Sequence, residues 1–146
     1  MRRRFAAFWV TIGLVLSLAG CGDPDQQMRS EGARAAREAV SGVRTAQLVA
    51  QSLLDGKVWD QPATVMVTDA EEALGQVATT FDARQPESAE SRETYDQYSE
   101  ALSSAADGVT ELRIALRNGD LDAVRQQVGQ LDKTAEQLEQ LGERAQ

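Results

Sequence analysis

A regular apolar pattern in the second half of the chain limits the folds that it can adopt. Apolar side chains recur there at alternating spacings of three and four residues, over 95–116 and again over 121–138. In an α-helix this spacing places them on one stripe, which is buried against other helices. We therefore predict two long helices, each with one buried face. The two stripes are Tyr95, Tyr98, Leu102, Ala105, Val109, Leu112 and Leu116, and Leu121, Val124, Val128, Leu131, Ala135 and Leu138.

The residues between these stripes predict how the two helices are connected. They read Asn118-Gly119-Asp120. Glycine favours the left-handed conformation that ends many helices, and an N-cap aspartate accepts hydrogen bonds from the free N–H groups of the next helix. Because the connection is so short, we predict that the two helices pack antiparallel. Gln85-Pro86 is expected to separate the second and third helices in a similar way.

Two further apolar stripes occupy the first half of the chain, over about 33–54 and 62–83. The second helix could begin at either of two positions. Pro62 suits a first helical turn, whereas Thr68 and Glu71 would form a capping box if the helix began later. The stripes are Ala36, Ala39, Val40, Val43, Ala46, Ala50, Leu53 and Leu54, and Val67, Ala70, Leu74, Val77 and Phe81.

These patterns together predict an all-α fold, an antiparallel up-down-up-down four-helix bundle. The expected helices are 33–54, 62–83, 87–117 and 121–144. Their striped portions are each about 22 residues, or about 33 Å long at 1.5 Å per residue, and short turns join them. The alternative is a dimer of helical hairpins in which the last two stripes pair between chains. We favour a monomer.

The first 20 residues have a different character. Residues 2–4 are all arginine and precede an apolar run. That run is about 15 residues long, which is short of the roughly 20 needed to span a bilayer. A basic start followed by a short apolar run is typical of a cleavable secretory signal. The arginines are compatible with either the general or the twin-arginine export route.

The run ends in Leu18-Ala19-Gly20-Cys21, which resembles the bacterial lipobox. The resemblance implies that a signal peptidase recognises Leu18, Ala19 and Gly20 and leaves a lipid-bearing Cys21 as the first mature residue. A membrane helix with an incidental cysteine and an ordinary cleaved signal are the alternatives. Since Cys21 is the only cysteine, it has no partner within the chain for a disulfide.

The chain divides into a signal peptide over 1–20, a segment over 21–32 that begins with the lipidated Cys21 and is a tether or a frayed helix start, and a helical bundle over 33–146. Removing the signal peptide removes three arginines and changes the formal net charge from −8 to −11. A protein this acidic is a poor partner for nucleic acid or for anionic lipid headgroups. We therefore expect acyl chains on Cys21 to attach it to the outer face of the cytoplasmic membrane.

Missing residue types exclude most catalytic chemistry. The chain has no histidine, and Cys21 is expected to be acylated. This removes histidine-dependent triads, thiolate zinc sites, the Glu-x-x-His di-iron sites of helical bundles and histidine-ligated haem. No phosphate-binding glycine motif is present. We expect no enzymatic activity, no metal and no cofactor.

Two acidic pairs could in principle contribute to a metal site. Glu71 and Glu72 are adjacent on a helix and point about 100° apart, so they are interpreted as a solvated helix face. Asp120 and Asp122 lack the glycine and distal glutamate of a calcium loop, and they are interpreted as an N-cap and a first-turn acid.

Four aromatic residues are the remaining candidates for binding. Trp59 falls in the turn farthest from the anchor, where a lone aromatic usually covers the end of the core; contact with a partner protein is the alternative. Phe81, Tyr95 and Tyr98 are expected to meet at the anchor end. They are interpreted as core, with an apolar-ligand site as the alternative.

The body resembles the small helical lipoproteins of high-GC Gram-positive bacteria, through its acidic, alanine-rich stretches such as 68–75 and 112–117. The resemblance implies a place in the cell envelope and no particular activity. We expect a non-enzymatic, membrane-anchored lipoprotein that presents a surface to an unknown protein partner. The alternatives are a bundle that binds a small apolar ligand or lipid, and a structural spacer of the envelope.

Overall fold

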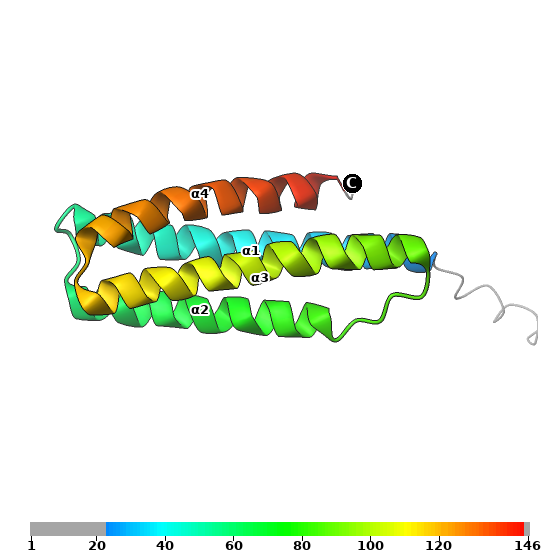
Figure 1. The fold of residues 1–146 in the computed structure, drawn as a ribbon, viewed down its shortest axis with the longest axis horizontal. Coiled ribbons are helices and arrows are strands. Elements are labelled where there is room, and N and C mark those ends of the chain that lie inside the picture. Colours follow the sequence, from blue (N-terminus) through cyan, green and yellow to red (C-terminus); the bar gives the residue numbers. More distant parts are fainter. Residues whose placement is uncertain (1–22, 145–146) are drawn as a thin grey trace, which may run out of the picture.

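A computed structural model describes residues 23–144, which form the predicted antiparallel four-helix bundle (Figure 1). The helices are α1 (Pro24–Leu54), α2 (Asp60–Asp82), α3 (Ala89–Asn118) and α4 (Leu121–Glu143). Each helix contacts the next one along the chain, and α4 closes the bundle against α1. The prediction of the fold from the apolar stripes is confirmed.

The bundle is not square in cross-section. The parallel pair α1 and α3 contact each other across one diagonal, whereas α2 and α4 make no contact within residues 23–144. Figure 1 shows α2 and α4 on opposite sides of the α1–α3 pair. The central pair is also longer, with 31 and 30 residues against 23 in each outer helix.

The small residues of α1 permit this diagonal contact. Its buried face is mostly alanine, which lets a neighbouring backbone approach closely. The tightest contact is at Gly32, where an added Cβ would lie 2.5 Å from the ring of Tyr98 on α3. Larger side chains from the other helices fill the rest of the core, and the largest of these that are fully buried are Leu102, Leu112, Leu131, Leu138, Val67, Val109 and Val124.

The turn between α3 and α4 has the predicted geometry. Gly119 adopts the left-handed conformation, with φ of 66°. The Asp120 carboxylate then accepts a hydrogen bond of 3.0 Å from the Ala123 N–H and caps α4. This turn reverses the chain within two residues, which explains why α3 and α4 pack antiparallel.

Of the two expectations for residues 21–32, the tether is wrong from Pro24 onwards and the helix start is confirmed there, because α1 begins nine residues before the expected helix at 33. Asp23 caps the helix by accepting a hydrogen bond of 3.1 Å from the Asp25 N–H, and Pro24 suits the first helical position. Met28 and Gly32 are buried in this segment. The apolar pattern failed here because a single methionine and a glycine do not make a recognisable stripe.

Two smaller differences concern α2 and α4. The second helix begins at Asp60, so Pro62 lies in its first turn and the later start is wrong. The Thr68 hydroxyl donates to the Thr64 carbonyl oxygen inside the helix instead of capping it. Leu121, predicted to be part of the buried stripe of α4, is 44% exposed.

Replacing Gly32 by alanine tests the diagonal contact. The new methyl group would collide with the Tyr98 ring, so we expect the free energy of unfolding to fall by about 1–3 kcal/mol. Gly129→Ala is the matched control, because no atom lies within 4 Å of its added Cβ. In that mid-helix position alanine should stabilise the protein by about 0.5–1 kcal/mol. Equal effects of the two substitutions in urea unfolding would contradict the close approach of α1 and α3.

Candidate functional site

The bundle has two chemically different ends. The proximal end consists of the first turns of α1 and α3 together with the 83–88 connection (Figure 1). In the sequence it comes directly after the predicted anchor. The distal end consists of the 55–59 turn and residues 119–121. Candidate residues from the sequence fall at both ends.

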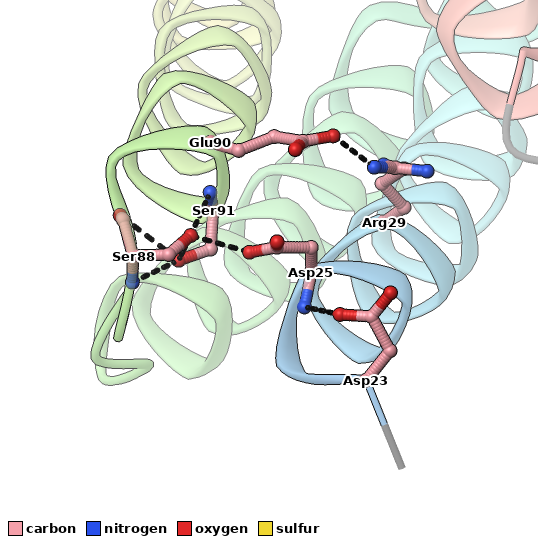
Figure 2. Close-up of polar contacts among 6 residues, drawn as sticks. All are labelled: Asp23, Asp25, Arg29, Ser88, Glu90 and Ser91. Atoms are coloured by element: carbon pink, nitrogen blue, oxygen red, sulfur yellow. Dashed lines mark hydrogen bonds and ion pairs between the residues drawn. The ribbon is translucent and has the colours of Figure 1, made fainter.

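At the proximal end, polar side chains cap both central helices (Figure 2). Ser88 accepts a hydrogen bond of 2.9 Å from the Ser91 N–H, and the Ser91 hydroxyl accepts one of 2.8 Å from the Ser88 N–H. This capping box satisfies two backbone donors that the start of α3 would otherwise leave free.

Side chains of α1 also reach across to α3 at this end. The Ser88 hydroxyl donates to the Asp25 carboxylate, and Arg29 forms an ion pair with Glu90 (Figure 2). Arg84 in the connection forms a third link, an ion pair of 3.2 Å with Glu31 of α1. The N-terminal turns of α1 are therefore joined to the rest of the bundle.

The predicted anchor residues Leu18, Ala19, Gly20 and Cys21 lie outside the described residues. Their roles in processing and lipidation stay predictions. The structure nevertheless limits the length of chain between Cys21 and the bundle, because the N-cap Asp23 is only two positions later.

The aromatic residues Phe81, Tyr95 and Tyr98 meet as expected. The Phe81 ring stacks on Tyr95 with centroids 5.5 Å apart and meets Tyr98 edge-on at 6.0 Å. Phe81 and Tyr98 are buried, and burial raises the pKa of Tyr98. The Tyr98 hydroxyl donates to the Leu141 carbonyl oxygen at 2.7 Å, and Tyr95 donates to that of Asp82 at 3.1 Å. These rings pack against one another as core, so the space between them is filled.

The distal end differs from the favoured expectation for Trp59. Its side chain does not cover the core, because the residue is 83% exposed. The neighbouring Val58 packs against the core instead. Trp59 is also the N-cap residue of α2, and its side chain makes no capping hydrogen bond there. Neither core packing nor helix capping therefore explains why a tryptophan occupies this position.

Other large apolar side chains are exposed in the same half of the molecule. Each of the four helices contributes at least one, and all lie towards the distal end of their helix. We call these residues, with Trp59, the distal collar: Leu48, Trp59, Val65, Met66, Ile114 and Leu121. Within residues 23–144, no equally large exposed apolar residue is found towards the proximal end.

The acidic pair at the start of α4 has structural partners. Asp120 caps α4, and Asp122 forms an ion pair of 2.6 Å with Arg125, as their positions at a helix start suggest. In the described part of the chain, no three His, Cys, Asp or Glu side chains gather in a way that could hold a metal ion.

The prediction that Glu71 is part of a solvated face is wrong. Glu71 is half-buried and forms an ion pair with Arg113 of α3, and it also accepts a hydrogen bond of 2.7 Å from the Thr110 hydroxyl. Partial burial opposes ionisation, but the hydrogen bonds from Arg113 and Thr110 outweigh it, so the pKa of Glu71 is lowered. Its neighbour Glu72 is exposed, as predicted.

A second polar network joins α1 to α4 and was not predicted. Gln47 is 4% exposed, and its amide donates to the Val128 carbonyl oxygen at 3.1 Å. Arg44 donates to the Gln47 side chain and forms ion pairs with Asp132 and Glu139. The hydrogen bond from Arg44 lowers the pKa of Asp132. This network is structural, since its members satisfy one another.

The lowered pKa of Glu71 predicts a pH-dependent contribution to stability. The contribution is complete above the ordinary pKa of 4.5 and is lost as the pH falls through the lower pKa of the folded state. Wild type should therefore be more stable than Glu71→Gln in urea near pH 7, and the difference should shrink as the pH falls below 4.5 and through the lower pKa of the folded state. Glu72→Gln is the control and should show neither effect. A stability difference for Glu71→Gln that does not change with pH would contradict this assignment.

No family model, no curated protein and no solved structure matches the chain. Among residues 23–144, none of the helices has the length and apolar content required to cross a bilayer.

Proposed function

We propose that this protein is a non-enzymatic lipoprotein of the cell envelope, and that the distal end of its bundle binds a protein partner. The observation that carries the proposal is the exposure of Trp59, which is 83% accessible at the end away from the predicted anchor. Tryptophan is enriched among the residues that contribute most to protein–protein binding, because one side chain buries a large area.

The other residues of the distal collar support this proposal. Isolated exposed apolar residues are common on protein surfaces. Here, however, they share one half of the bundle, although the chain is acidic and otherwise polar outside its core. A partner that covers Trp59 and Leu121 would remove both from water.

The anchor supports a location at the outer face of the cytoplasmic membrane. The lipobox-like sequence ending in Cys21 would provide two or three acyl chains, which hold a protein firmly where a single chain binds reversibly. The mature net charge of −11 disfavours both nucleic acid and electrostatic attraction to anionic lipid.

The absence of histidine and of a second cysteine supports a non-enzymatic role without a cofactor. The apolar-ligand alternative places the ligand among Phe81, Tyr95 and Tyr98. Their rings fill the space in question, so we do not propose that site. A structural spacer does not require an exposed indole at its end. Cross-linking from position 59 distinguishes a spacer from a protein that binds a partner.

Photo-cross-linking in cells tests the proposed surface. A photoreactive amino acid at position 59 should yield a specific adduct with another protein, whereas one at the exposed position 136, away from the distal collar, should not. Trp59→Ala should weaken association with the captured protein and change the free energy of unfolding by less than about 0.5 kcal/mol, because the side chain is exposed. Only background adducts at both positions, together with normal behaviour of Trp59→Ala, would favour a spacer.

A further inference from the structure

We propose that the bundle stands upright on the membrane without a flexible tether, which holds the distal collar at a set height above the lipid. This inference rests on the proposed lipidation of Cys21. It identifies the partner more narrowly as a folded extracytoplasmic protein, or part of one, that presents an apolar surface at that height.

The covalent distance between the anchor and the bundle is short. Two Cα–Cα steps separate Cys21 from the helix cap Asp23, and they span at most about 7 Å. The headgroup layer of one leaflet is itself about 5–8 Å thick. The start of α1 is therefore confined to the membrane surface.

The start of α1 is also secured and cannot readily unwind into a tether. Asp23 and Pro24 cap its first turn, and Met28 is only 6% exposed. The links from Asp25 to Ser88 and from Arg29 to Glu90 tie the first two turns to α3 (Figure 2). Unwinding would break these contacts and expose Met28, which opposes it.

The two ends of the bundle differ in how they would meet the lipid. The proximal end carries exposed carboxylates, among them Asp23, Glu87 and Glu90, so it should rest on the headgroups and not sink between them. The apolar residues that could enter a bilayer lie in the distal collar, far from the anchor. Because the net charge is −11, nothing in the overall electrostatics draws the bundle down onto anionic lipid.

The helix length then sets the height of the collar. At 1.5 Å per residue, Leu48 lies about 36 Å along α1 from Pro24, and Leu54 about 45 Å. Trp59 follows in the next turn. A partner must therefore reach about 36–45 Å above the membrane surface, which short loops of an integral membrane protein do not do.

Trp59 itself provides the test, because the chain contains only Trp9 and Trp59 and the first lies in the predicted signal peptide. The purified lipidated protein is reconstituted in phosphatidylcholine–phosphatidylglycerol vesicles that carry a nitroxide on the lipid headgroup. We expect the emission of Trp59 to be unaffected by the nitroxide lipid. The matched probe, Trp59→Phe combined with Gln26→Trp, places the indole at an exposed position of the proximal end and should lose at least about half of its emission.

A flexible glycine–serine insertion between Gly22 and Asp23 should reduce quenching at position 26, because it lets the bundle leave the surface. Quenching of Trp59 as strong as that of the position 26 probe would overturn the upright arrangement, since it would mean that the bundle lies flat. Vesicle flotation separates this result from a failure of the anchor. A Cys21→Ala protein that lacks residues 1–20 should remain unbound, and its flotation with the vesicles would overturn the proposal that acyl chains on Cys21 hold the protein on the membrane.

Discussion

The close contact between α1 and α3 is the constraint on which the rest of the structure depends. Gly32 and the alanines of α1 let α3 approach across the diagonal, with the Tyr98 ring lying where a larger residue would have its Cβ. Because the two helices are parallel, their N-termini come together at one end, where Ser88 meets Asp25 and Arg29 meets Glu90. The same contact separates the outer helices α2 and α4, which do not touch each other within residues 23–144.

The sequence predicts the architecture well where the signal is periodic and local. The stripes of α3 and α4 and the Gly119 turn are local patterns, and the structure contains them. Three features depend on contacts between distant residues and could not be predicted. The early start of α1 depends on the cap that Asp23 provides and on the burial of Met28. The lowered pKa of Glu71 depends on Arg113, which comes from another helix. Trp59 is exposed, whereas its neighbour Val58 packs against the core.

The arrangement of polar and apolar residues divides the molecule by function. The proximal end is polar, capped and tied together, which suits a surface next to lipid headgroups. The distal half carries the exposed apolar side chains of the distal collar. In our proposal the lipid holds the protein at the membrane, the helices set the distance of the distal collar from the membrane surface, and Trp59 contacts the partner. Cys21 is then a site that processing enzymes modify, not a catalytic residue.

The most direct test of this account is the mass of the N-terminal tryptic peptide of the protein isolated from its own membranes. We predict that this peptide covers Cys21–Arg29 and carries a diacylglyceryl group on the cysteine, with or without a further acyl chain on its amino group. The peptide Phe5–Arg29, which would retain the predicted signal peptide, or Cys21–Arg29 with an unmodified thiol would contradict the account, because the bundle would then lack its proposed attachment to the lipid.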